Sequence, residues 1–161
     1  MSPRAASRLE SLGYTKVYDY VTGLADWTAN GLPTEGRLAA VLRAGDVVRR
    51  GVPTCRLGDR LRDVTRDIKE AEQNVCIVTS DDRVVLGRLR GEALKADPDA
   101  TVESVMESGP TTIRPDVPLA DVTERMRARR VGSIIVTTST GHLVGLLYRK
   151  DAEERLANQS A

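Results

Sequence analysis

The stretch RRVGSIIVTTSTGHLVGLLYRKDAEERL, residues 129–156, decides the fold. It contains two short apolar segments, Ser133–Thr137 and His142–Leu147. The turn-forming residues TSTG separate them, so the pair predicts a β-hairpin. The charged run from Arg149 to Leu156 then predicts a helix. A strand–turn–strand–helix order is therefore expected at this end of the chain.

The preceding residues complete a repeating unit. TTIRPDVPLADVTERM, residues 111–126, predicts a short strand and an amphipathic helix with Leu119, Val122 and Met126 on one face. A shift of 58 residues aligns residues 47–94 with residues 105–152 without a gap. Identical pairs in this alignment include Gly51/Gly109, Thr54/Thr112, Leu61/Leu119, Val64/Val122, Ile77/Ile135, Val78/Val136 and Gly87/Gly145.

The repeat sets the expected fold class. Each copy has the order β-α-β-β-α, and one copy alone buries too little surface to be stable. We therefore expect an α/β protein of the α+β type, in which two such units pack sheet against sheet with pseudo-twofold symmetry. A short α/β fragment at the N-terminus would complete the chain.

Composition excludes several function classes. The chain has 161 residues, 24 Lys and Arg against 23 Asp and Glu, and only five aromatic side chains, so a strongly basic nucleic-acid binder is not expected. It has neither a long apolar run nor a secretory leader, which predicts a cytoplasmic protein without a membrane partner. Cys55 and Cys76 fit no metal-ligand spacing, and we expect both to be buried thiols. With His142 as the single histidine, a surface position is expected for it and His-based catalysis is not.

These repeated units resemble a tandem CBS-domain pair, often called a Bateman module. The resemblance covers residues 45–156 and rests on the repeat length, the order of elements and the closing Gly-x-x-x-x-x-Asp. It implies a non-catalytic sensor that binds an adenosine-containing ligand, of the AMP, ADP, ATP or S-adenosylmethionine class, in a cleft between paired units. It also implies a homodimer and a regulated protein that the sequence does not identify. No cofactor is expected to be required.

The family signature places a Gly, a Ser or Thr and an Asp at fixed spacing. Here they correspond to Gly145, Tyr148 and Asp151, so the middle position departs from the pattern. A carboxylate at a helix start can accept hydrogen bonds from both ribose hydroxyls, and nearby cations suit a phosphate. The implied ligand-binding residues are Thr112, Arg114, Val131, Gly132, Ser133, Gly145, Tyr148, Arg149, Lys150 and Asp151.

Structural interpretations remain open for these residues. Asp151 is equally suited to cap a helix, and Tyr148 to cover the end of the sheet. The first copy has Gly87, Arg90 and Ala93 at the signature positions, so it lacks the ribose acceptor, and at most one competent cleft is expected. Arg88 and Arg90 would then attract an anion or form a surface strand edge. The arginines between 125 and 130 would be solvated or face the phosphate cleft or a nucleic acid.

The first 36 residues lie outside the repeat. They predict a helix from Ser2 to Leu12, a short strand over Lys16–Tyr20 and a helix over Gly23–Asn30. The segment resembles the last third of a rhodanese domain through Arg4, Ala5, Ala6, Gly13, Val17, Gly23, Trp27, Gly31, Leu32 and Pro33. The chain begins after the position of that family's catalytic cysteine, so sulfur transfer is not expected.

The expected organisation is therefore a rhodanese-like fragment at 1–36, a linker at 37–44, CBS units at 45–98 and 99–156, and a polar tail at 157–161. The leading hypothesis for function is the adenosine sensor. A ligand-free dimerisation scaffold is the first alternative, and a degraded sulfurtransferase is the second.

Overall fold

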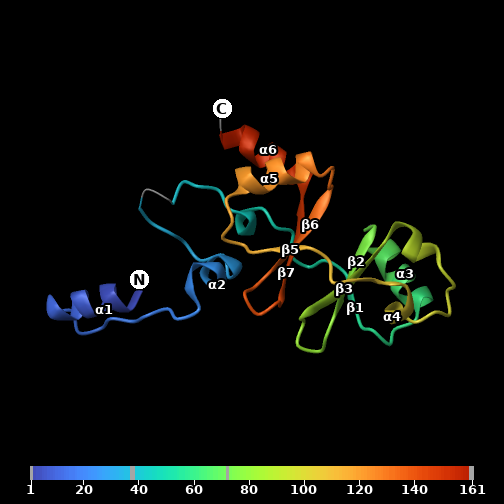
Figure 1. Ribbon diagram of the computed structural model, residues 1–161, viewed down its shortest axis with the longest axis horizontal. Helices are drawn as coiled ribbons and strands as arrows, with labels where there is room; N and C mark the ends of the chain where they lie inside the picture. Colours follow the sequence, from blue (N-terminus) through green and yellow to red (C-terminus); the bar gives the residue numbers. More distant parts are fainter. Residues whose placement is uncertain (1, 37–38, 72, 160–161) are drawn as a thin grey trace.

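The computed structural model describes residues 2–36, 39–71 and 73–159. Two small sheets form the body of the protein (Figure 1). The first sheet has the order β1-β2-β3-β4 and consists of Thr54–Cys55, Val75–Thr79, Val85–Arg90 and Glu107–Ser108. The second has the order β5-β6-β7 and consists of Thr112–Ile113, Ser133–Thr137 and Leu143–Tyr148. The predicted hairpins are therefore present, with each second strand shifted by one residue.

The two sheets repeat each other in detail. In both, a short strand pairs in parallel with the first hairpin strand, and the hairpin strands pair antiparallel. A register shift interrupts the hairpin between Val78 and Thr79 in the first copy, and between Val136 and Thr137 in the second. These positions are 58 residues apart, so the sequence repeat is a structural repeat.

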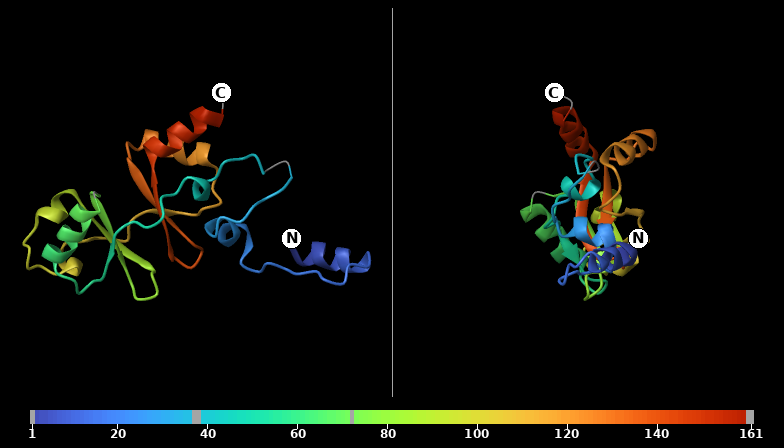
Figure 2. Two further views of the ribbon diagram at one scale, coloured as in Figure 1. Left: turned by 180° about the vertical axis from the view of Figure 1, so that it is seen from behind. Right: turned by 90° about the vertical axis from the view of Figure 1, so that its left-hand side faces the viewer.

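Helices cover the outer face of each sheet. The helix α3 (Leu61–Glu70) packs on the first sheet, and α5 (Leu119–Ala128) with α6 (Arg149–Gln159) on the second (Figures 1 and 2). The helix α6 extends to Gln159, which places helix where a polar tail from residue 157 was expected. Residues 37–38 of the expected linker, and 160–161 of the expected tail, lie outside the described residues.

The first unit lacks the closing helix that the repeat predicts. A 3-10 turn, η2 (Gly91–Lys95), stands where α6 stands in the second unit. Gly91 follows β3 with a φ of 53°, which starts the chain away from a helical path. Pro98 then disfavours helix in the residue before it. The expected β-α-β-β-α order therefore holds fully only for the second unit.

The sheets pack against each other through an apolar interface. Val75, Ile77, Ile135 and Leu146 are buried between them. Val85 and Leu143 extend this contact at the hairpin ends, where the Val85 N–H donates to the carbonyl oxygen of Gly141 at 3.0 Å. The predicted sheet-against-sheet arrangement with pseudo-twofold symmetry is confirmed.

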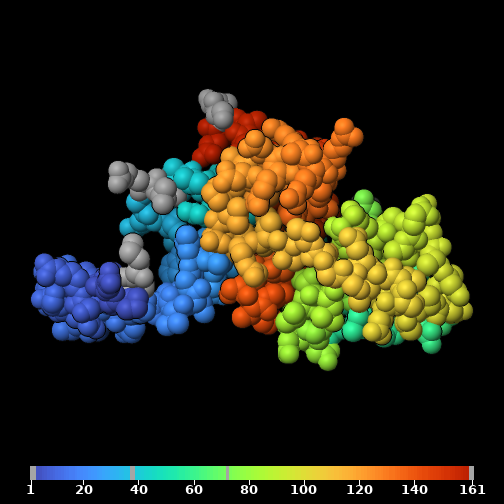
Figure 3. Space-filling view, in the orientation of Figure 1, coloured from blue at the N-terminus to red at the C-terminus, as the bar shows by residue number. Residues whose placement is uncertain are grey.

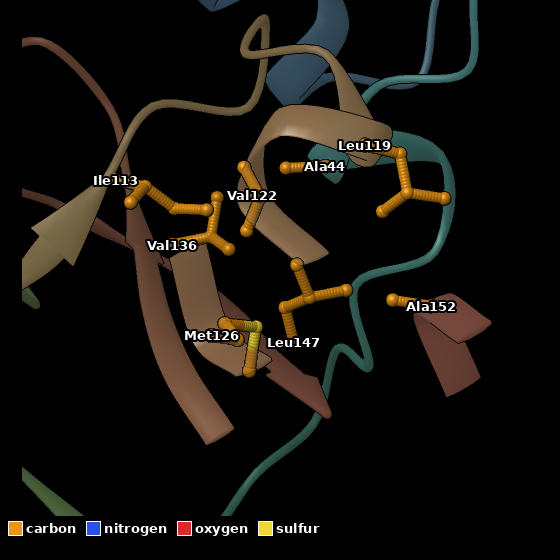
Figure 4. Packing of buried hydrophobic residues seen from close by; sticks show 8 residues of the cluster. All are labelled: Ala44, Ile113, Leu119, Val122, Met126, Val136, Leu147 and Ala152. Atoms are coloured by element: carbon orange, nitrogen blue, oxygen red, sulfur yellow. The ribbon is translucent and has the colours of Figure 1, made fainter. Parts of the chain in front are cut away.

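The segment that precedes the first strand of each unit packs on the other unit. Ala44, in the 3-10 turn η1 (Ala44–Asp46), is fully buried in the core of the second unit beside Leu119 and Val122 (Figure 4). Val102, in α4 (Val102–Val105), is fully buried in the core of the first unit. Contacts therefore cross the expected boundaries near residues 45 and 99, and they join the two units.

Residues 44–49 and 102–107, which we call the crossing segments, lie close to β7 and β3, and this close approach requires a glycine in each strand. Arg49 exchanges two backbone hydrogen bonds with Leu146, of 2.9 and 3.0 Å. A Cβ on Gly145 would lie 2.2 Å from the Arg49 carbonyl oxygen, and one on Gly87 would lie 2.5 Å from Met106 Sδ. The repeated glycine therefore has a packing role in both copies.

The N-terminal residues form two helices, α1 (Ser2–Ser11) and α2 (Gly23–Ala29), as predicted. The strand expected over Lys16–Tyr20 is wrong, because this segment has no regular structure and no described strand pairs with it. The expected α/β fragment is therefore helical only. In Figure 3 the first residues project from the body, and the side chains of Tyr18 and Val21 are 87% and 90% exposed.

Candidate functional site

The signature residues meet at the junction of β7 and α6. Asp151 lies in the first turn of α6, and Tyr148 is the last residue of β7. Arg49 binds the Asp151 carboxylate in a bidentate manner, because its Nε donates to Oδ2 at 2.5 Å and its Nη2 donates to Oδ1 at 2.7 Å. Asp151 therefore has both oxygens engaged by a residue that lies 102 positions earlier.

Arg49 and Tyr148 form one surface with this carboxylate. The Arg49 guanidinium lies 4.8 Å from the centre of the Tyr148 ring, in a cation–π contact. The hydrogen bond to Asp151 raises the pKa of Arg49 above its usual value. Burial raises the pKa of Tyr148, whose hydroxyl donates to Gln73 Oε1 of the first unit at 3.1 Å. Tyr148 thus covers the sheet end and joins the two units at the candidate site.

Arg49 was not recognised from the sequence. It aligns with Glu107 in the second copy, which reverses the charge at that position. Glu107 pairs through its backbone with Arg88, as Arg49 does with Leu146, and its carboxylate accepts two hydrogen bonds of 2.8 Å from Arg88. These bonds hold the pKa of Glu107 below its usual value. The reversed charge distinguishes the two copies at this position, but it does not indicate Asp151 as the partner of Arg49.

Arg149 and Lys150 flank Asp151 at the start of α6. The Arg149 side chain lies 3.8 Å from Glu153, and its backbone N–H donates to the Gly132 carbonyl oxygen at 2.9 Å. Lys150 is exposed. Both cations therefore lie next to Asp151, as the sequence predicts.

The other predicted residues line a different cavity. Thr112, Val131 and Ser133 contribute to a cavity of about 160 Å³ in the second unit, together with arginines 88, 125 and 129. Gly145, Tyr148 and Asp151 are not among its lining residues. The structure therefore divides the predicted set between two places, because the signature of one unit faces the other unit.

Arg114 serves the fold of its own unit. Its guanidinium donates to the Thr137 hydroxyl at 2.9 Å and to the carbonyl oxygen of Thr138. These contacts fix the turn between β6 and β7. The proposed ligand-binding role of Arg114 stays a prediction.

The first unit has a cavity of about 460 Å³ at the equivalent place, lined by Asp59, Asp63 and Asp67 and by both thiols. Cys55 and Cys76 are free and buried, as predicted. The hydrogen bond with Cys55, together with burial, raises the pKa of the Cys76 thiol. The raised pKa of Cys76 disfavours its thiolate, which is the form that reacts.

His142 has a local structural role. Its backbone N–H donates to the Thr138 hydroxyl at 3.1 Å, and its Nδ1 lies 2.7 Å from the Thr140 hydroxyl. Within residues 2–36, 39–71 and 73–159, no group of acidic, histidine or cysteine side chains is arranged to hold a metal ion. Over the same residues, every helix is too short or too polar to cross a bilayer.

Comparison with protein families agrees with this architecture. Residues 102–158 match the CBS domain family. No curated protein matches the chain. Solved structures of CBS domain pairs share its fold, but the comparisons give no support to a rhodanese-like fragment at residues 1–36.

Three of these structures show the extent of the similarity. The CBS domains of a transcriptional regulator from Streptococcus pneumoniae have a TM-score of 0.63 and 22% identity, over 70% of this chain and 98% of that chain. The CBS domain pair of protein MJ0100, in complex with 5'-methylthioadenosine and S-adenosyl-L-methionine, has a TM-score of 0.64 and 14% identity, over 74% and 98%. The cytosolic domain of the Mg²⁺ channel MgtE, in complex with ATP, has a TM-score of 0.66 and 22% identity. The match covers 73% of this chain but only 51% of that MgtE structure.

Proposed function

We propose that this chain is a non-catalytic regulatory module that binds an adenosine-containing ligand at Asp151. The observation that carries the proposal is the position of this carboxylate. It lies in the first turn of α6, directly after β7, at the spacing from Gly145 that the CBS signature requires. The cytosolic domain of MgtE is described in complex with ATP, and the CBS domain pair of MJ0100 in complex with S-adenosyl-L-methionine, which supports this ligand class.

Ligand binding in this proposal is an exchange of partners at Asp151. The two hydroxyls of a ribose would donate to the carboxylate oxygens that now accept from Arg49. The released guanidinium, with Arg149 and Lys150, would offer positive charge to a phosphate or carboxylate of the ligand. The Tyr148 ring, at the position where the family has a small hydroxyl, would narrow the cleft or stack on the base.

The same exchange would carry a signal. Arg49 precedes the first strand of the first unit, yet its backbone pairs with Leu146 in β7. Release of its side chain would loosen one of the contacts by which this segment binds the second unit. We propose that a regulated protein, or the second subunit of a homodimer in the cytoplasm, responds to that change.

A ligand-free scaffold is the second candidate, and one observation favours it. The Arg49–Asp151 ion pair satisfies the carboxylate without any ligand. In that case the module would serve dimerisation or partner binding alone. Sulfur transfer is not proposed, because the two thiols are 5% and 1% exposed and lie in the repeat.

Thermal unfolding with candidate ligands tests the proposal. We expect AMP, ADP, ATP or S-adenosylmethionine at millimolar concentration to raise the midpoint, because a ligand that binds only the folded state stabilises it. Asp151→Ala should abolish the increase. Glu154→Ala removes a carboxylate from an exposed position of the same helix and should leave the increase unchanged. A wild-type protein that responds to none of the four ligands would support the scaffold.

A further inference from the structure

The two units contain cavities at equivalent places but with opposite charge. Residues 58 positions apart line both, as Thr54/Thr112, Cys55/Ile113 and Val64/Val122 show. Each cavity lies between the short first strand of a unit and the helix that follows it. The difference between the cavities is therefore one of side chains, because the backbone that forms them is repeated.

Charge distinguishes the two cavities. The cavity of the first unit is lined by three carboxylates, Asp59, Asp63 and Asp67, and one cation, Arg60. Among the residues that the structure describes, the lining of the second cavity contains three cations, at positions 88, 125 and 129, and no carboxylate. Two substitutions between the copies account for much of this reversal, Asp67/Arg125 and Ala71/Arg129.

Two of these arginines are available to a ligand. Arg125 lies in the last turn of α5 and Arg129 directly follows that helix. Their guanidinium groups form no hydrogen bond or ion pair with any residue of 2–36, 39–71 and 73–159. Like charges at this spacing repel each other, and an anion between them would remove the repulsion. Arg88 enters the same cavity from β3 of the first unit, and its charge is shared with Glu107 at 2.8 Å.

Hydroxyl groups complete the set of donors. Thr112 and Ser133 line the same cavity and can donate to the oxygens of an anion. Arginine side chains bind phosphate oxygens in a bidentate manner. The volume of about 160 Å³ is below the roughly 300–1,000 Å³ of pockets that enclose drug-sized ligands. A phosphoryl group fits this space better than a whole nucleotide does.

We propose that this cavity, which we call the basic cavity, binds a phosphate-bearing anion through Arg125 and Arg129, with Arg88 as a third cation. Asp151, the candidate ribose acceptor, does not line this cavity, so the proposed recognition involves the phosphate and not a ribose. The proposal goes beyond the adenosine site and does not depend on Asp151. The phosphoryl group can belong to a free phosphate compound or to the phosphate end of a nucleotide.

Calorimetric titration of the full chain with inorganic pyrophosphate tests the proposal. We expect saturable binding that weakens with salt and falls by about tenfold or more in Arg125→Gln/Arg129→Gln, because hydrogen bonds between charged groups are lost. The matched control Arg4→Gln/Arg155→Gln removes the same charge from exposed positions on α1 and α6, and should bind within about twofold of the wild type. Both side chains in the test variant are exposed, and a circular dichroism spectrum checks that it folds.

Two further titrations identify the source of the phosphoryl group and separate this proposal from the adenosine site. In the Asp151→Asn background, Arg125→Gln/Arg129→Gln should still lower the affinity for pyrophosphate by about tenfold or more, because Asp151 does not line the basic cavity. If only ATP binds to this variant and the Arg125/Arg129 substitutions remove that binding, the source is a nucleotide and the proposal holds. Two results would overturn it: neither anion binds, or the test and control variants weaken binding equally.

Discussion

At the residue scale, the ion pair between Arg49 and Asp151 governs the candidate site. Asp151 could be found from the sequence, because the spacing from Gly145 is local and matches a known signature. Arg49 could not, since the pair joins residues 102 positions apart and only the crossing of the units brings them together. Local spacing thus identified the acceptor, and tertiary structure supplied its partner.

Competition between Arg49 and a ribose leads to a prediction. Arg49→Gln should raise the affinity for adenosine by about two- to fivefold, because the carboxylate no longer has to release an exposed ionic partner. Adenosine carries no phosphate, so it gains nothing from the freed guanidinium. Calorimetric titration measures the change, with Arg50→Gln, an exposed neighbour, as the control. Equal affinities for wild type and Arg49→Gln would show that the ion pair does not compete with the ligand.

At the element scale, the crossing segments explain features that the repeat alone left unexplained. The sequence predicted both hairpins to within one residue, because apolar runs and turn residues are local signals. It did not predict the missing helix of the first unit, where Gly91 and Pro98 override the pattern of the second copy. The repeated glycine belongs to the ligand signature in the sequence. In the structure it also allows the close approach of a neighbouring segment in both copies.

The packing at Gly145 gives a prediction about stability. A methyl group there would overlap the backbone of Arg49, so Gly145→Ala should lower the free energy of unfolding by about 1–3 kcal/mol, as overpacked positions do. Gly58→Ala is the matched control, because no atom lies within 4 Å of its Cβ position. Urea denaturation followed by circular dichroism measures both. A Gly145→Ala protein as stable as the control would contradict the close approach described here.

At the scale of the whole molecule, the body consists of two units joined by their sheets and by the crossing segments. The sequence predicted this arrangement, because one repeat unit alone buries too little surface to be stable. It failed for Lys16–Tyr20, where alternation alone suggested a strand. A strand needs a hydrogen-bonding neighbour, and no described strand pairs with this segment. The charge of the two cavities could not be predicted from the sequence, because it depends on which side chains of each helix line the cavity.

Independence of the first residues from the body gives a third prediction. Deletion of residues 2–19 should change the midpoint of thermal unfolding by no more than about 2 °C, because it removes mainly exposed side chains. The deletion keeps Tyr20, whose ring contacts Trp27 edge-on with the centroids 5.2 Å apart. Differential scanning calorimetry of both proteins measures the shift. A decrease of more than about 5 °C would mean that this segment stabilises the folded units.

The central claim is that Asp151 accepts an adenosine-containing ligand, and calorimetric titration tests it most directly. Each of AMP, ADP, ATP and S-adenosylmethionine would be titrated into wild type, Asp151→Asn and Glu154→Gln. The account predicts saturable binding of at least one ligand to wild type and Glu154→Gln, with about tenfold or more loss in Asp151→Asn. Absence of binding to the wild type, or equal affinities for all three proteins, would contradict it.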